Sequence, residues 1–209
     1  MDIEAYILIG GRSSRLGRDK AFASIGGAPL AGHALKIVME GLEPAKTTFV
    51  AGNASQFAIE AITLDAPFIF DLVPDRGPLG GLHAALSYAQ TPWIFLLACD
   101  MPLLTPDLLK LLAARVGGDL AVVIPAQADG RLQPLCAFYK VTDAYKLVDD
   151  IIHRPRVSPP MHEIIRELNP NIVQFDEYSH LPDAEELFLN INTARDLESA
   201  RKIERKPSA

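Results

Sequence analysis

The chain has 209 residues, of which 49% are hydrophobic and 22% are charged, a balance typical of a globular protein and not of a disordered one. Lysine and arginine number 20 and aspartate and glutamate 26, so the net charge is −6, which argues against nucleic acid or an anionic membrane as the main partner. No apolar run approaches the roughly 20 residues that cross a bilayer, and residues 1–9 lack the basic start of a signal peptide.

The first 125 residues or so alternate between strand and helix signals. Short apolar runs rich in β-branched residues predict strands over 3–9, 47–51, 67–70, 93–98 and 120–124. Apolar residues at helical spacing predict helices over 30–42, 55–62, 82–89 and 107–114. Before the last of these, Thr105 is a predicted N-cap and Pro106 a first helical residue. This alternation predicts a doubly wound, mostly parallel α/β sheet.

Beyond residue 125 the pattern becomes mixed. The predicted strands there are 135–139, 172–175 and 188–191, and the predicted helices are 144–152, 158–168 and 194–205. The pairs Gly117-Gly118 and Asp129-Gly130 mark turns, and no segment has the composition of a linker. We therefore expect a single domain over residues 1–209, with one half over about 1–125 and a second over about 126–205.

In doubly wound sheets, ligands bind outside the carboxyl ends of the strands. The loops that follow predicted strands are therefore the places to look for a site, and these are 10–20, 52–54, 71–81 and 99–105. The first loop carries four cations and one anion between Arg12 and Lys20, and its three glycines would let backbone amides curl around a phosphate. It matches neither a Walker loop nor a Gly-x-Gly-x-x-Gly fingerprint, so a solvated basic loop is the plain alternative.

Cysteine and histidine give no sign of a metal site. Cys99 and Cys136 form no Cys-x-x-Cys pair, which excludes a disulfide framework and a zinc ribbon. Buried reduced thiols in a cytoplasmic protein are the simplest interpretation, so we expect a cytoplasmic location. The five histidines show neither metal-ligand spacing nor a nucleophile–base pair.

The basic loop reads Gly-Gly-x-Ser-x-Arg-Leu-Gly-x-Asp-Lys directly after the first strand, and this pattern resembles the signature of the MobA-like nucleotidyltransferase family. Three more segments resemble that family in order: Gly-Pro-Leu-Gly-Gly-Leu at 77–82, Cys-Asp-Met-Pro at 99–102 and Asn-Ile-Asn-Thr at 190–193. The resemblance covers about residues 3–197 and is greatest to the members that guanylylate the molybdenum cofactor. It implies a Rossmann-like nucleotidyltransferase fold, with nucleotide in the first half and the second substrate in the other.

The resemblance also assigns a nucleotide site. It implies that the base and ribose lie on the end of the first strand and on polar residues after the second and third strands. Asp71 would accept from the guanine N1–H and N2–H groups, but Asp75 is a second candidate and the sequence leaves this choice open. Asp71 and Asn53 are also ordinary turn residues. The residues implied in nucleotide binding are Leu8, Ile9, Gly10, Gly11, Lys20, Asn53, Asp71 and Asp100.

Three of the implied site residues would act on the phosphates. Lys20 would offset charge on the α-phosphate and on departing pyrophosphate, and Arg15 has a fork suited to a bidentate grip. Asp100 follows the apolar strand 93–98. It would be a ligand of a Mg²⁺ ion that links it to the phosphates, because Mg²⁺ takes one or two carboxylates plus phosphate oxygens. The alternative for Asp100 is a turn cap.

The implied reaction joins GTP and molybdenum-molybdopterin to give the guanine dinucleotide cofactor and pyrophosphate. Direct in-line attack by the terminal phosphate of molybdopterin needs no covalent enzyme intermediate. Gln133, Asn190 and Asn192 are candidates for the second-substrate side, although Thr193 beside them is also a natural helix N-cap. A molybdoenzyme or another cofactor-biosynthesis protein is a candidate recipient of the product.

Other interpretations stay open at this point. The same chemistry fits cytidylyl transfer to the same cofactor, or a sugar-phosphate or phospholactate nucleotidyltransferase. Gly10-Gly11 in place of Ala-Gly favours the guanylyl interpretation by resemblance. A non-catalytic nucleotide carrier would keep the glycine-rich loop but would not need Asp100.

Overall fold

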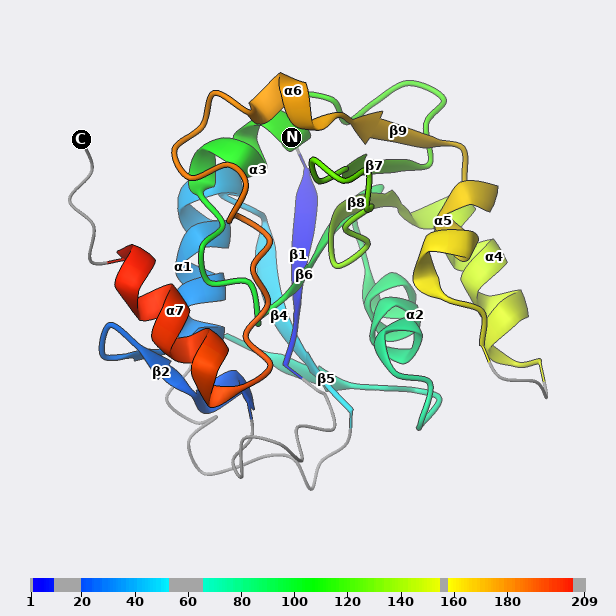
Figure 1. Cartoon of the computed structure of the whole chain (residues 1–209). Coiled ribbons are helices and arrows are strands. Elements are labelled where there is room, and N and C mark those ends of the chain that lie inside the picture. The colour runs from blue at the N-terminus through cyan, green and yellow to red at the C-terminus, as the bar shows by residue number, and fades with distance from the viewer. Residues whose placement is uncertain (1, 10–19, 53–65, 155–157, 205–209) are drawn as a thin grey trace.

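A seven-stranded sheet forms the centre of the molecule (Figure 1). The computed structural model describes residues 2–9, 20–52, 66–154 and 158–204. The sheet order is β5-β4-β1-β6-β8-β7-β9, with β8 antiparallel to its two neighbours and every other pair parallel. This confirms the predicted α/β class with a mixed part contributed by later residues. The strands are β1 (Ile3–Leu8), β4 (Lys46–Ala51), β5 (Phe68–Phe70), β6 (Trp93–Ala98), β7 (Val122–Pro125), β8 (Cys136–Lys140) and β9 (Pro170–Val173).

β1 lies between β4 and β6 in parallel register, from Ile3 beside Trp93 to Leu8 beside Ala98. Every residue of β1 and β6 is buried, as expected for parallel strands covered on both faces. Since β5, β4, β1 and β6 all point the same way, their carboxyl ends meet at one edge of the sheet. β8, from the second half of the chain, inserts between β6 and β7 of the first half, so one sheet runs through both halves.

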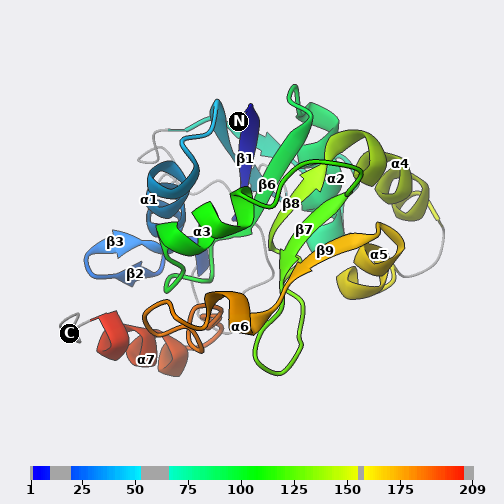
Figure 2. The same cartoon turned by 90° about the horizontal axis from the view of Figure 1, so that it is seen from above.

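Helices cover the two faces of the sheet (Figures 1 and 2). On one face of the sheet, α1 and α3 pack against Ala5 and Ile7 of β1. On the opposite face, α2, α4 and α5 pack with the group that contains Tyr6 and Leu8. This alternation is the two-residue period of a strand. The helices are α1 (Leu30–Leu42), α2 (Pro78–Tyr88), α3 (Pro106–Ala113), α4 (Val141–Ile152), α5 (Met161–Glu167), α6 (Phe175–Tyr178) and α7 (Ala194–Glu204), with a short 3₁₀ helix η1 (Lys20–Phe22).

Local chemistry sets several of these boundaries. Thr105 accepts a hydrogen bond from the amide of Leu108 through its side chain, and Pro106 follows as the first helical residue, so the predicted cap of α3 is confirmed. Leu108, Leu109 and Leu112 then bury one face of α3. Such burial, at about 25 cal/mol per Å² of apolar surface, is the main stabilising contribution of a surface helix.

A small hairpin and the last helix form a satellite of the main sheet. β2 (Ser24–Ile25) pairs with β3 (Ala28–Pro29) in antiparallel fashion, and α7 lies beside this hairpin (Figure 2). Ile25, Leu30, Ile191 and Ala200 bury one another in an apolar cluster between them. The hairpin was not predicted, because strands of two residues are too short to show an alternating pattern.

Three expectations about element boundaries are wrong. α2 begins at Pro78, whereas 71–81 was expected to be a loop; glycines at 80 and 81 weaken the helix signal, but Pro78 follows Gly77 with a φ of 57° and starts the helix. Residues 188–191 were expected to form a strand, yet within the described residues they pair with no strand of the sheet; Phe188 ends a run of turns, and the Ile191 amide is hydrogen-bonded to the Asp100 carbonyl instead. The strand expected over 172–175 lies at 170–173, and residue 175 begins α6.

The helix expected over 55–62 lies outside the described residues. Cys99 and Cys136 are both buried and neither forms a disulfide, and burial raises the pKa of the Cys136 thiol. None of the helices within the described ranges has the length and apolar character of a membrane-spanning segment.

Candidate functional site

Backbone hydrogen bonds extend the central strands beyond their last paired residues at the carboxyl edge of the sheet. The Ile9 amide donates to the Val50 carbonyl at 2.9 Å, and the Cys99 amide donates to the Leu8 carbonyl at 3.1 Å. The Asp71 amide donates to the Ala51 carbonyl at 3.0 Å. These bonds fix the starting points of the loops after β1, β6 and β5, so Ile9, Asp71 and the Cys99–Asp100 step lie along one edge.

Asp71 is half-buried at the end of β5, next to the start of α2. Burial raises the pKa of its carboxyl group to about 6, because removing water disfavours the charged form. A Cβ atom at Gly80 would lie 2.8 Å from Oδ2 of Asp71 and 3.3 Å from the Val73 carbonyl. Gly80 therefore lets the helix approach this carboxylate closely, because a Cβ atom at position 80 would require the carboxylate or the helix to shift.

Gly81 plays the same part toward β1. A Cβ atom there would lie 2.7 Å from Cδ2 of Leu8, one of the residues assigned to the nucleotide site. The 77–82 segment is thus the first turn of α2, packed by its two glycines against Asp71 on one side and Leu8 on the other. Sequence reasoning singled out this segment by resemblance, but it missed these contacts, because nothing local pairs position 80 with position 71.

Asp75, the alternative to Asp71, lies in a different environment. It is exposed, and its backbone has a left-handed φ of 61° in the turn before α2. Asn and Asp tolerate this conformation better than most residues, so a turn-forming role accounts for Asp75. Asp71 is the carboxylate that Gly80 of α2 approaches closely.

Asp100 follows β6 and lies in the turn before α3. Its Oδ1 atom is shielded from solvent, and its carbonyl oxygen accepts a hydrogen bond from the Ile191 amide at 2.9 Å. Asn190 and Asn192 flank Ile191, so the structure brings these two second-substrate candidates to the loop that carries Asp100. The sequence distance between the two segments hides this approach from sequence reasoning.

The segment after Ile191 is held by a reciprocal cap. The amides of Asn192 and Thr193 donate to Oδ2 of Asp196 at 2.8 and 2.7 Å, and the Asp196 amide donates to Oγ1 of Thr193 at 3.2 Å. The expected N-cap role of Thr193 is therefore confirmed. Asp196 was missed, although Thr-x-x-Asp is close to the capping-box pattern that could have revealed it.

Gln133 lies at the same edge of the sheet. Gln133 is buried, and its backbone amide donates a hydrogen bond to the Pro125 carbonyl at the end of β7. Two residues later, the Leu135 carbonyl accepts a hydrogen bond from the Ala98 amide at the end of β6. The structure thus places Gln133 in the turn that joins β7 to β8, next to the end of the strand that leads into Asp100. Its side-chain role stays a prediction.

Four assigned residues, Gly10, Gly11, Arg15 and Asn53, lie outside the described residues. Lys20 begins η1, which is followed by the β2–β3 hairpin. Through the apolar cluster of Ile25 and Ile191, this hairpin contacts the same C-terminal segment that is hydrogen-bonded to Asp100. The C-terminal segment around Ile191 therefore contacts both the hairpin that follows Lys20 and the loop that carries Asp100.

A doubly wound sheet with polar residues at its carboxyl edge, and with a helix brought close by glycines, is the arrangement of an α/β protein that binds its ligand outside the ends of the strands. Residues 5–157 match the MobA-like NTP transferase domain, and the chain belongs to this family.

Named relatives match most of the chain. The molybdenum cofactor guanylyltransferase of Vibrio cholerae is 30% identical over 204 residues, which are 94% of this chain and 90% of that protein. The protein of the same name from Cupriavidus pinatubonensis is 36% identical over 158 residues, which are 72% and 75% of the two chains. The structure of molybdopterin-guanine dinucleotide biosynthesis protein A from Archaeoglobus fulgidus is similar with a TM-score of 0.75 at 27% identity, covering 96% and 97%.

Proposed function

We propose that this chain transfers GMP from GTP to molybdenum-molybdopterin and releases pyrophosphate. The observation that carries the proposal is the placement of two carboxylates, Asp71 at the end of β5 and Asp100 at the end of β6. Three strand spacings separate β5 from β6, roughly 14 Å at ~4.8 Å each. A nucleotide lying across the ends of β4 and β1 would have its base at Asp71 and its phosphates toward Asp100. The names of the relatives support the same reaction.

Asp71 would select the base. An ionised carboxylate offers only acceptors, and guanine presents two adjacent donors, N1–H and N2–H, on one edge. Cytosine has a single donor group on that edge, so it would leave one carboxylate oxygen without a partner. Leu8 and Ile9, at the end of β1, would form the apolar floor beneath base and ribose.

Asp100 is the residue we propose as ligand of Mg²⁺. Its carboxylate is a hard oxygen donor, and the described residues hold no group of three His, Cys, Asp or Glu that could bind a metal. A single carboxylate suits Mg²⁺, which usually completes its coordination with water and substrate phosphates. When bound, the ion would draw negative charge from the phosphate oxygens. Lys20 and Arg15 would add positive charge on the same phosphates.

Gln133, Asn190 and Asn192 would orient the second substrate by hydrogen bonds. An oxygen of its terminal phosphate forms a bond to the α-phosphorus of GTP, and the bond from that phosphorus to the bridging oxygen breaks. Pyrophosphate leaves with the electron pair. Positioning and charge stabilisation suffice for such a step, which needs no nucleophile from the protein.

The test is incubation with each of the four nucleoside triphosphates, Mg²⁺ and molybdenum-molybdopterin, followed by the mass of the product. Only GTP is expected to give the dinucleotide cofactor. A cytosine product would replace the base assignment, and nucleotide binding without any product would favour a carrier. We further propose a cytoplasmic site of action and a molybdoenzyme or a cofactor-biosynthesis protein as recipient. The two buried cysteines, Cys99 and Cys136, form no disulfide, which supports a reducing compartment.

A further inference from the structure

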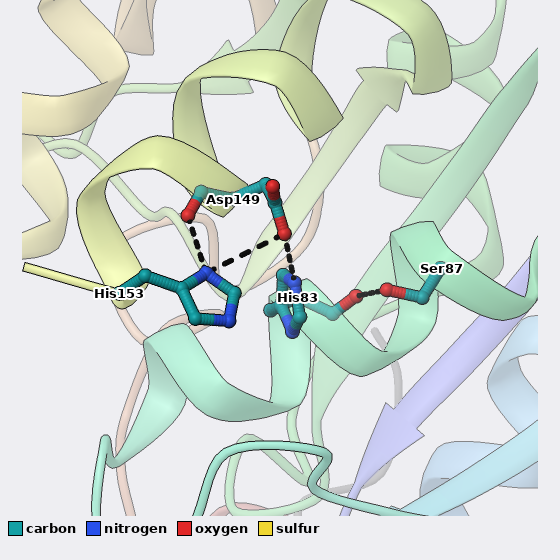
Figure 3. Close-up of polar contacts among 4 residues, drawn as sticks. All are labelled: His83, Ser87, Asp149 and His153. Atoms are coloured by element: carbon teal, nitrogen blue, oxygen red, sulfur yellow. Dashed lines mark hydrogen bonds and ion pairs between the residues drawn. The ribbon is translucent and has the colours of Figure 1, made fainter.

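A buried histidine joins α2 to α4 on the face of the sheet opposite α1 and α3 (Figure 3). Nε2 of His83 lies 2.9 Å from Oδ1 of Asp149 on α4, and His83 is only 4% exposed. Nδ1 of His153 lies 2.8 Å from the Asp149 carbonyl oxygen and 3.6 Å from its Oδ1. None of these residues belongs to the site described above.

The direction of the central hydrogen bond follows from the charge on Asp149. The hydrogen bond from His83, followed by smaller contributions that include the charges of His153 and His83, holds the pKa of the Asp149 carboxyl below its ordinary value. Asp149 is therefore an ionised acceptor at neutral pH, and Nε2 of His83 is the donor. Within the described residues, Nδ1 of His83 is buried without a hydrogen-bond partner, so Asp149 is the contact that orients the ring.

Packing leaves the His83 ring little freedom to turn. Tyr145 stacks on it with ring centroids 5.8 Å apart, and His153 meets it edge-on at the same distance. A ring held on its sides and hydrogen-bonded at Nε2 fixes one distance between α2 and α4. This contact, which we call the α2–α4 latch (His83 and Asp149), joins residues that are far apart in the sequence.

A second polar contact ties the same two segments together. Nη2 of Arg76, in the turn before α2, donates to the carbonyl oxygen of Arg154 at 3.0 Å. Arg154 lies just after the end of α4, so both contacts join residues 71–83 to the C-terminal end of that helix.

Two glycines in the part of the chain between these two contacts pack closely against residues assigned to the nucleotide site. Gly80 leaves no room for a Cβ atom beside Asp71, and Gly81 leaves none beside Leu8. His83 comes two residues after Gly81 in the same helix. A small shift of α2 away from α4 would therefore change the approach of its first turn to Asp71 and Leu8.

We propose that His83 is a positioning residue for the nucleotide site, which it serves by holding the first turn of α2 against Asp71 and Leu8 through its hydrogen bond to Asp149. This inference rests on the proposed function, because Asp71 and Leu8 are assigned there to GTP. In consequence α4, from the second half of the chain, sets the nucleotide affinity of the first half.

The experiment compares His83→Leu, which removes the donor but keeps an apolar filling, with His83→Gln, whose amide nitrogen can reach the position of Nε2. His83→Leu is expected to weaken GTP binding about tenfold, the size expected for a hydrogen bond to a charged partner, and to leave the KM for molybdenum-molybdopterin unchanged. His83→Gln restores most of the affinity. Rates at saturating GTP stay close to those of the unmodified chain.

Two further variants separate positioning from loss of stability. Ser87→Ala removes the hydrogen bond from Oγ to the His83 carbonyl, 2.7 Å long, one turn along the same helix, and GTP affinity should be unchanged. Asp149→Ala removes the half-exposed acceptor of the latch and should weaken GTP binding as His83→Leu does, with no further loss in the double variant. Equal losses in Ser87→Ala and His83→Leu, or an unchanged GTP affinity in His83→Leu, would overturn the proposal.

Amide hydrogen exchange of residues 79–83, measured without any nucleotide, tests the latch apart from the proposed function. Faster exchange in His83→Leu than in His83→Gln is expected. If the unmodified chain binds no GTP, the proposed function fails, and the exchange comparison then decides the role of the latch alone. Identical exchange in both variants would contradict it, whatever nucleotide is bound.

Discussion

The backbone amide of Ile191 is hydrogen-bonded to the carbonyl oxygen of Asp100 at 2.9 Å. Ile191 is fully buried in the cluster that also holds the β2–β3 hairpin, so the bond joins the C-terminal segment to the loop after β6. Because Asn190 and Asn192 flank Ile191, the same bond fixes where their side chains begin relative to Asp100. The C-terminal segment thus lies beside the loop that carries Asp100, although it comes from the far end of the sequence.

The N-terminal cap of α7 should help to hold the C-terminal segment beside Asp100. Asp196→Ala removes the acceptor of two amide hydrogen bonds, from Asn192 and Thr193, and should lower the free energy of unfolding by about 1 kcal/mol. We expect a higher KM for molybdenum-molybdopterin and an unchanged affinity for GTP in steady-state kinetics and calorimetry. Glu198→Ala, at an exposed position of the same helix, is the matched control. A rise in both the KM for molybdenum-molybdopterin and the dissociation constant for GTP would show that the cap does not act locally.

Asp100→Asn keeps the size of the side chain and removes its charge. If Asp100 holds the metal at the phosphates, the turnover number should fall at least about 10²-fold, as expected when organised charge stabilisation is lost. Initial rates at saturating substrates measure this fall. Asp107→Asn, an exposed carboxylate in the first turn of α3, should leave the rate unchanged. Near-normal turnover by Asp100→Asn would reject a catalytic role for this carboxylate.

Sequence patterns predicted the parts of the fold that are set locally. The apolar run of β6 begins and ends at the expected residues, 93 and 98, because a strand buried on both faces needs every side chain to be apolar. Thr105 and Pro106 likewise mark the start of α3 by their own chemistry. The place of β8 between β6 and β7 could not be read in the same way, since strand order depends on contacts between distant segments.

The candidate site shows the same division. Asp71 and Asp100 stand out in the sequence because each follows an apolar strand, and the structure puts both at the carboxyl edge. The glycine at position 80 was expected in a loop, since glycine weakens a helix signal, whereas its use is to admit Asp71. Asp149, the partner of His83, offers no signal at all, because an aspartate on a helix is usually just a solvated side chain.

Gly80→Ala tests the close approach of α2 to Asp71. The added methyl group would lie 2.8 Å from Oδ2 of Asp71 and 3.3 Å from the Val73 carbonyl, and overpacking of this kind typically costs about 1–3 kcal/mol. We expect weaker GTP binding in calorimetry together with a lower melting temperature. Gly32→Ala, in α1, meets only the side chain of Pro29 at 3.3 Å and serves as the control. Tight GTP binding by Gly80→Ala would place the base away from Asp71.

The raised pKa of Asp71 predicts a change in stability with pH. Its carboxyl has a pKa of about 6 in the folded chain against 3.8 ordinarily, so the ionised form is disfavoured by folding. Above pH 6, Asp71→Asn should therefore raise the free energy of unfolding by about 1–2 kcal/mol, less than a shift of two pKa units gives for a fully buried group. The gain should shrink as the pH falls below 6, and it is lost below about pH 3.8, where the carboxyl becomes protonated in the unfolded as well as the folded state. Urea unfolding between pH 7 and pH 3 measures it, and a gain that persists in full at pH 3 would contradict the assignment.

GTP binding should favour the ionised form of Asp71, which is the form that folding disfavours. The carboxylate form of Asp71 accepts from guanine N1–H and N2–H, whereas the protonated form leaves an O–H facing a donor. Above pH 6 the dissociation constant should be nearly flat, and below pH 6 it should rise by up to about tenfold per pH unit, because only the ionised fraction binds. Asp71→Asn should bind GTP weakly at every pH and show no such break, while Asp75→Asn, at the exposed turn, should keep the profile of the unmodified chain. If Asp75→Asn abolishes the break and Asp71→Asn retains it, the carboxylate that reads the base is Asp75.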